Sequence, residues 1–378
     1  MKKNTKMLVI ALVMVGILLF GFYLVNASKP KDTIKLGMIS GLSGGTTSFG
    51  IPALNAAQLA VNEINSKGGV KGHKLELIVE DGQCDGKLAS DATNKLINID
   101  HVPLIYTVCS TVTLSSAKIA NESSTVVFGV MSASPAISSA GDYVFRISPN
   151  DTKGTEMLAN YMYEEGYRKV SILTAPDAFS ASVQKDFENK FKELGGTIAF
   201  SEQYATDQID FRTEITKIKS ANTDAVLFLP LKGVNSIEFL KQLDTLANGT
   251  ALFSTRALVN KDVLDAVPTL LEGVIYSEIK FDQDKEDFVA FLSNYRTTYN
   301  TDPTYSLQMV AGVYDSVYIT AQALEKCDQE DTECIKDYLY SVKDYDGTSG
   351  TISFDKNGDP DMYFQLNIVR DGKATLLK

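Results

Sequence analysis

The chain has 378 residues, of which 44% are hydrophobic and 22% are charged, and its formal net charge is −11. This length suffices for two or three domains with packed cores, and the composition is that of a globular protein. The acidic balance argues against nucleic acid or an anionic lipid surface as a partner.

The N-terminal 32 residues are predicted to be an export segment and a short linker. Lys2, Lys3 and Lys6 precede an apolar run from Met7 to Val25. A positive flank before an apolar segment directs export of the chain that follows. The run is nearly long enough to span a bilayer, so we favour an uncleaved membrane anchor over a signal peptide cleaved after Ala27. Either way, the remainder is expected outside the cytoplasm, at the cell surface or in the periplasm.

From residue 33 onward, short β-branched runs alternate with amphipathic helical segments. Strands are predicted at residues 33–40, 74–81, 102–108, 124–131 and 143–148. The helices between them are predicted from Pro52 to Ser66, from Lys87 to Ile99 and from about Thr113. Pro52 suits a first helical turn, and Gly68 and Gly69 end that helix.

A second series of the same kind begins after Pro149. Its strands are predicted at residues 169–176, 197–205, 225–230, 251–255 and 273–279, and its helices at 155–166, 181–196, 211–221 and 236–249. Helices follow at 286–299, at 306–325 and around 335–342. Two final strands, at 350–359 and 362–373, are predicted to be joined by a turn at Asn357-Gly358.

Two alternating series predict an α/β fold with two lobes, each built on a parallel sheet that helices cover on both faces. Residues 148–151, "SPND", suggest a point where the chain crosses from one lobe to the other. In open α/β sheets, ligands bind beyond the carboxyl ends of the strands. Candidate site residues are therefore sought in the segments 40–50, 110–113, 132–135, 176–179, 230–233 and 255–256.

Catalytic and metal-binding patterns are scarce in these segments. His73 and His101 both precede strands, which is the wrong end, and neither has a partner at metal-ligand spacing. The glycine-rich "SGLSGG" lacks the GxGxxG pattern of dinucleotide sites. We expect no catalytic site, no metal and no cofactor. An enzyme with Cys109 or Ser110 as its nucleophile remains a distant alternative.

Four cysteines in an exported chain indicate disulfides. Cys327 and Cys334 lie close together in the sequence and are predicted to pair across an acidic loop. The remaining two cysteines, Cys84 and Cys109, both lie at predicted strand ends and could form a second disulfide. The alternative is that all four are reduced. A bridged Cys109 cannot act as a nucleophile, because the nucleophile is the free thiolate.

Hydroxyl side chains gather where two strands lead into helices. Ser110, Thr111 and Thr113 follow one strand, and "MSASP" at residues 131–135 repeats the arrangement at the next strand end. Backbone amides at a helix N-terminus lack partners and carry partial positive charge, so a carboxylate docks there and hydroxyls add donors. Taken singly, each cluster is better explained as helix capping. Together, on consecutive strands, they favour a ligand site.

Several segments in order resemble the branched-chain amino-acid type of ABC-transporter substrate-binding proteins, which have the type I periplasmic-binding-protein fold. They are "IKLGMISGLSGGTTSFG", "NAAQLAVNEINSKGGVKGHKLELIVEDGQCD", "TVCSTVT", "MSASP", "YVFRISPND" and "GTISFDKNGD". The resemblance implies two Rossmann-like lobes joined by three crossing segments. Lobe one would comprise residues 33–148 and 278–349, and lobe two residues 149–277 and 350–378. Some members also carry a disulfide that matches Cys84 and Cys109.

The resemblance also implies a ligand-binding set. Ser110 matches the carboxylate-binding serine, Ser132 and Ala133 match the second binding loop, and Phe49 and Phe179 match aromatic walls from the two lobes. At Ala133 the members that bind amino acids usually have a hydroxyl residue.

A more serious departure is Arg256, which stands where the family has an acidic residue that holds the ligand ammonium. An arginine there would favour a second carboxylate or another strongly polar group, and Lys232 would add to that bias. The alternatives are that the match shifts by a residue or two, or that Arg256 turns outward to solvent.

The sequence therefore predicts the solute-binding component of an ABC importer, which captures an amino acid or related small carboxylate and delivers it to a membrane permease. The alternative is a ligand-binding sensor of the same fold that reports to a membrane partner.

Overall fold

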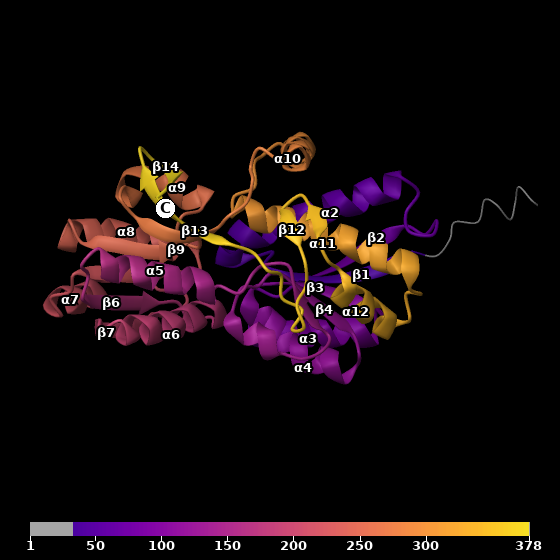
Figure 1. Cartoon of the computed structure of the whole chain (residues 1–378), viewed down its shortest axis with the longest axis horizontal. Helices are drawn as coiled ribbons and strands as arrows, with labels where there is room; N and C mark the ends of the chain where they lie inside the picture. Colours follow the sequence, from indigo (N-terminus) through magenta and orange to yellow (C-terminus); the bar gives the residue numbers. More distant parts are fainter. Residues whose placement is uncertain (1–32, 378) are drawn as a thin grey trace, which may run out of the picture.

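The computed structural model describes residues 33–377, which form two α/β lobes side by side (Figure 1). The predicted N-terminal anchor lies outside these residues. Within residues 33–377, no helix combines the length and the apolar character needed to cross a membrane.

The first lobe is built on a five-stranded parallel sheet of order β2-β1-β3-β4-β5. Its strands are β1 (Ile34–Ser40), β2 (Leu75–Asp81), β3 (Leu104–Val108), β4 (Val126–Met131) and β5 (Val144–Arg146). One face packs against α3 (Gly86–Asn98) and α4 (Ser110–Glu122). The other packs against α2 (Thr47–Ser66), α11 (Leu307–Lys326) and α12 (Thr332–Ser341), with α10 (Glu286–Tyr299) resting on α2. The all-buried β3 and β4 are typical of a sheet covered on both faces.

The second lobe has a seven-stranded sheet of order β14-β13-β10-β9-β8-β6-β7. Its strands are β6 (Lys169–Thr174), β7 (Thr197–Gln203), β8 (Ala225–Leu229), β9 (Ala251–Thr255), β10 (Ile275–Ile279), β13 (Phe364–Arg370) and β14 (Lys373–Leu376). The helices are α5 (Thr152–Glu164) and α6 (Ala178–Glu193) on one face, and α7 (Arg212–Ser220), α8 (Gly233–Ala247) and α9 (Lys261–Ala266) on the other. Strands β6 to β10 are parallel, whereas β13 runs antiparallel to both β10 and β14.

The C-terminal region corrects one sequence prediction. The turn at Asn357-Gly358 does not join two long strands: β12 (Gly350–Ile352) pairs with β11 (Tyr345–Gly347), and only a single bridge links Phe354 to Pro360. The hairpin lies further on, between β13 and β14, where Asp371 and Gly372 both have positive φ. An Asp-Gly pair suits this turn because both residues tolerate positive φ.

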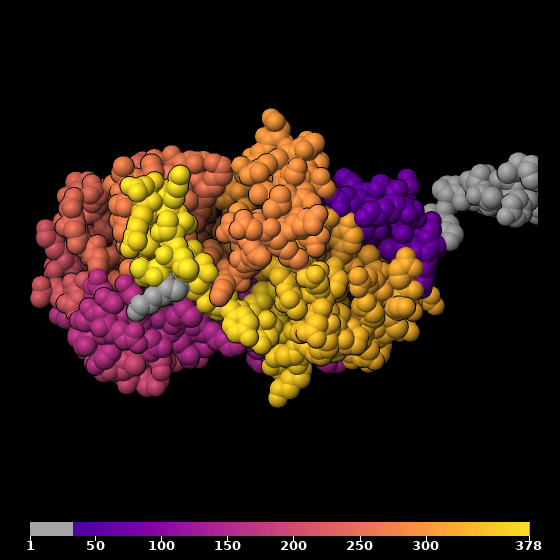
Figure 2. All heavy atoms as spheres, turned by 45° about the horizontal axis from the view of Figure 1, so that its top comes forward, coloured from indigo at the N-terminus to yellow at the C-terminus, as the bar shows by residue number. Residues whose placement is uncertain are grey.

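The lobe boundary predicted at residue 350 is also too early, because residues 350–354 still pack on the first lobe. The ring of Phe354 lies 5.8 Å from that of Phe128 and 5.9 Å from that of Phe145, in the core of the first lobe. The chain joins the second lobe only at β13. Figure 2 shows this C-terminal segment, in yellow, passing over the surface from one lobe to the other.

Three segments, at residues 147–151, 280–285 and 355–363, connect the lobes. Arg146, at the end of β5, ties the first of these to the third. Its guanidinium is fully buried and donates to the Asp359 carboxylate at 2.7 and 2.6 Å and to the Ser134 carbonyl at 2.7 Å. A bidentate arginine–carboxylate pair has a fixed geometry, so it sets how these two segments lie against each other.

Helix α2 begins at Thr47, five residues before the predicted start, and so Pro52 lies inside the helix. A proline there lacks the N–H that would bond to the carbonyl four residues earlier, which belongs to Ser48. The hydroxyl of Thr304 donates to the Ser48 carbonyl instead, at 2.7 Å. The segment between α10 and α11 thus supplies the hydrogen bond that the proline removes.

Candidate functional site

A pocket lies between the two lobes, beyond the carboxyl ends of their parallel strands. It encloses about 450 Å³ of empty space, counting its open mouth. Its walls are formed by Phe49, Cys109, Ser110, Met131, Ala133, Tyr305 and Met309 from the first lobe, and by Asp177, Phe179, Pro230, Leu231, Arg256 and Ala257 from the second. The structure thus brings together most of the residues that the sequence singled out, and it leaves Ser132 and Lys232 outside these walls.

The histidines lie elsewhere, as their sequence positions suggested. His73 lies just before β2 and His101 just before β3, at the opposite end of the first sheet from the pocket.

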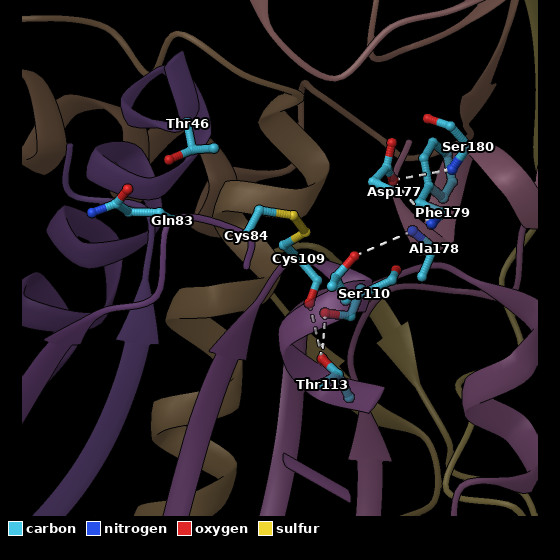
Figure 3. The surroundings of a disulfide bond; sticks show 12 residues. Thr46, Gln83, Cys84, Cys109, Ser110, Thr113, Asp177, Ala178, Phe179 and Ser180 are labelled. Atoms are coloured by element: carbon cyan, nitrogen blue, oxygen red, sulfur yellow. Dashed lines mark hydrogen bonds between the residues drawn. A yellow bond between two sulfur atoms is a disulfide. The ribbon is translucent and has the colours of Figure 1, made fainter. Parts of the chain in front are cut away.

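The disulfide between Cys84 and Cys109 borders the pocket (Figure 3). Their Cα atoms are 5.7 Å apart, as are those of the second disulfide, Cys327–Cys334. Both predicted disulfides are therefore present. Cys109 has a φ of 84°, which is uncommon for a residue other than glycine, and the bridge anchors this turn between β3 and α4. Because Cys109 is bridged, it offers no thiolate for catalysis.

Ser110 is the first residue of α4, so the helix begins nearer to the strand than predicted. The first backbone hydrogen bond of the helix runs from Thr113 N to Cys109 O at 3.1 Å, and the amides before it have no partner within the helix. The Ser110 hydroxyl accepts from Ser134 N at 3.1 Å. Since a hydroxyl can accept and donate together, its proton remains free for a ligand.

The end of β4 and the loop after it contribute Met131 and Ala133 to the pocket wall. The Ser132 hydroxyl instead hydrogen-bonds to the hydroxyl of Thr113, at 2.7 Å, inside the first lobe. Ser132 thus supports the loop and the helix rather than facing a ligand.

Two aromatic residues predicted to wall the ligand do line the pocket. Phe49 comes from the first turn of α2 and lies 5.7 Å, ring to ring, from Tyr305. Phe179 comes from the first turn of α6, on the other lobe. Tyr305 was missed by the sequence analysis because it precedes a helix and follows no strand.

Arg256 follows β9 and is only 2% exposed, which excludes an outward orientation. Its two terminal nitrogens donate to the Asp151 carboxylate at 2.9 and 2.8 Å, and its guanidinium carbon lies 5.7 Å from the centre of the Phe179 ring. Burial alone would lower the pKa of Arg256, but Asp151 more than offsets this and raises it. The carboxylate that Arg256 was expected to seek in a ligand is thus supplied by the protein.

Lys232, at the start of α8, also has an internal partner. Its ammonium lies 2.7 Å from the carboxylate of Asp207, which is itself exposed. The stem of the side chain lies against Gly45 of the first lobe: a Cβ atom at Gly45 would fall 2.6 Å from the lysine Cδ. Lys232 thus contacts the opposite lobe at the rim and does not face the pocket.

Asp177 is the acidic residue of the pocket wall that the sequence analysis passed over. Its Oδ1 accepts from the amides of Phe179 and Ser180 at 3.0 and 3.1 Å, which caps α6. Burial raises the pKa of Asp177, against the lowering effect of the Ser180 hydroxyl and the nearby amides. An aspartate just before a helix, within segment 176–179, could be recognised in the sequence, but it indicated only the N-cap of that helix.

The two lobes touch around the pocket. The hydroxyls of Ser134 and Ser182 are 2.6 Å apart, and Ala178 N donates to the Thr111 hydroxyl at 3.2 Å. These contacts join the loop after β4 and the N-terminus of α4 to the N-terminus of α6. The lobes are thus in contact across the cleft.

A sequence model of the family described as periplasmic binding protein matches residues 33–373. The chain belongs to this family. A leucine-, isoleucine-, valine-, threonine- and alanine-binding protein of Pseudomonas aeruginosa is 24% identical over 365 residues, which cover 95% of this chain and 94% of that protein.

Solved structures show the same fold. A leucine-binding protein from Thermotoga maritima MSB8 superposes with a TM-score of 0.82 at 23% identity, covering 92% of this chain and 98% of that one. A solute-binding protein of an ABC transporter from R. palustris, solved in complex with benzoate, gives 0.81 at 19% identity, covering 91% and 95%. The predicted type I periplasmic-binding-protein fold is confirmed.

Proposed function

We propose that this periplasmic binding protein is the solute-binding component of an ABC importer and that it captures an amino acid or a related small carboxylate between its lobes. The observation that carries the proposal is the N-terminus of α4 in the pocket wall. There, Ser110 and amides without helical partners offer donors to a carboxylate. The other walls are mainly apolar, which suits a small ligand with a hydrocarbon part.

The names of similar proteins support this ligand class. The Pseudomonas relative is named for five amino acids, and the R. palustris structure holds benzoate, which also bears a carboxylate. These ligands differ in whether they carry an ammonium group. The carboxylate is the feature that they share.

The mechanism that follows is capture and closure. The carboxylate docks first on the Ser110 side, and the aromatic rings of Phe49 and Phe179 take up the apolar part from the two lobes. The contacts Ser134–Ser182 and Thr111–Ala178 then form across the cleft, and the closed protein is the form that a permease in the membrane would recognise. The sequence of residues 7–25 supports a tether that would hold the protein beside that permease.

A thermal-shift panel tests the proposal on the purified full-length protein, with amino acids, their amides, monocarboxylates and dicarboxylates as probes. A probe that binds the folded state alone, present at 100 times its Kd, stabilises it by about 2.7 kcal/mol, which raises Tm measurably. We expect stabilisation by at least one free carboxylate and none by the matching amide, because the amide lacks the charge that the α4 terminus favours. Equal stabilisation by acid and amide, or by neither, would contradict the proposal.

A further inference from the structure

One carboxylate oxygen in the pocket wall has no partner. Asp177 is only 6% exposed, and its Oδ1 is used by the cap of α6. Within residues 33–377 its Oδ2 has no partner in hydrogen-bond geometry, and the nearby Ser180 hydroxyl, which lowers the pKa of Asp177, is likewise without one. A buried carboxylate oxygen without a donor is costly to the folded state. The position of Asp177 in the pocket wall therefore points to a donor that a ligand brings.

The nearby cations of the protein are already paired. Arg256 gives both terminal nitrogens to Asp151, and Lys232 bonds to Asp207 outside the pocket. The second-lobe side of the pocket thus carries an uncompensated acid and favours a cationic group in the ligand.

Asp177 lies close to the proposed carboxylate site. Ala178 N donates to the Thr111 hydroxyl at 3.2 Å, so the N-termini of α6 and α4 face each other, with Asp177 beside one and Ser110 beside the other (Figure 3). An α-amino acid carries its carboxylate and its ammonium on the same carbon. A ligand of this kind that met both residues at once would give Asp177 a partner, whereas a simple carboxylate would leave it without one.

We propose that the ligand is a zwitterionic α-amino acid whose ammonium donates to Oδ2 of Asp177. This deepens the proposed function and rests on it, since it takes the carboxylate to be held at Ser110. Arg256 then lines the pocket as the partner of Asp151, and position 256 is not where the ammonium is bound. Asp177 is thereby a specificity-determining residue, which separates amino acids from carboxylates that lack the amino group.

The test compares each amino acid with the same acid without its amino group, by isothermal titration calorimetry on the full-length protein. The pairs are leucine with 4-methylpentanoate, valine with 3-methylbutanoate, and phenylalanine with 3-phenylpropanoate. For the pair that binds, we expect the amino acid to bind about 10- to 100-fold more tightly, as for a hydrogen bond to a charged group. We expect Asp177→Asn to remove most of that factor, because it should weaken the amino acid and not the deaminated acid.

Asn and Ser both cap helices well, so Asp177→Asn and Asp177→Ser should keep α6 intact while removing the charge. Asp85→Asn is the matched control, because Asp85 caps α3 in the same way but is exposed and lies outside the pocket. It should leave every affinity unchanged.

The possible outcomes distinguish a failure of the Asp177 inference from a failure of the proposed function. If the deaminated acids bind as tightly as the amino acids, or if neither Asp177 variant changes the preference, Asp177 is a helix cap only and the inference is wrong. The proposed function then still holds, because carboxylates bind. If no acid of either series binds, both the proposed function and the inference fall.

Discussion

The buried pair of Arg256 and Asp151 gives a prediction that depends on which partner is removed. The two side chains are 2% and 1% exposed and share two hydrogen bonds. Removing one partner of such a pair costs about 3–5 kcal/mol, because the other charge stays buried without compensation. Asp151→Asn leaves a guanidinium that cannot lose its proton, so we expect this full loss in the free energy of unfolding at every pH near neutrality.

Arg256→Met leaves Asp151 instead, and a carboxylate can take up a proton. Burial already acts to raise the pKa of Asp151, and without Arg256 the carboxyl group should stay protonated in the folded protein. Arg146, whose charge also reaches Asp151, is held by Asp359 and should only moderate this effect. The folded pKa then exceeds the unfolded one, so stability is retained at low pH and lost as the pH rises.

The two variants should therefore respond differently to pH. As the pH rises above about 4, the ordinary pKa of an unfolded aspartate, the free energy of unfolding of Arg256→Met should fall relative to Asp151→Asn, by up to about 1.4 kcal/mol per pH unit. Urea unfolding followed by circular dichroism measures both variants from about pH 4 to neutral pH, with the wild-type protein as the reference. Parallel pH profiles of the two variants, or a loss below about 1 kcal/mol for Asp151→Asn, would refute the reasoning.

Three other predictions test separate parts of the structure. Ser110→Ala should weaken carboxylate binding about 10- to 100-fold in calorimetry, since a donor to a charged group is lost, with little change in the deaminated-to-amino acid preference. Gly45→Val should clash with Lys232 across the rim and weaken every ligand while the free energy of unfolding stays unchanged; tighter binding would contradict this contact. Thr304→Val should cost about 1–3 kcal/mol in urea unfolding, because the Ser48 carbonyl loses its donor, and an unchanged midpoint would mean that water replaces the hydroxyl.

The alternation of strands and helices was sufficient to predict the two lobes, because each series carries its own hydrophobic pattern over short distances. The ends of elements were harder. Pro52 looked like a first-turn proline, and nothing near it in the sequence shows that Thr304 satisfies the carbonyl of Ser48. The hairpin was placed at Asn357-Gly358, although Asp371-Gly372 carries an equally strong turn signal and is the one used.

The residues of the candidate site that follow strand ends could be predicted from the sequence. The ion pairs between side chains distant in the sequence could not. Ser110, Ala133 and the two phenylalanines follow or face strand ends, and they line the pocket. The partner of Arg256 is 105 residues away in the sequence, in a segment interpreted only as a crossing point. A charge read from the sequence therefore suggested a ligand of the opposite sign, when the protein already supplied it.

The path of the chain through the first lobe bears on how the protein is made. All five strands of that sheet lie within residues 34–146, but α11 and α12, which share one of its faces with α2, come from residues 307–341. The second lobe is mostly encoded between them. A chain that emerges from its N-terminus can cover this face only in part, with α2, while the second lobe is still being produced, and exposed apolar surface of this kind promotes aggregation. The second lobe can gather its parallel strands early, whereas the first is completed only when α11 arrives, so the growing chain needs protection over that interval.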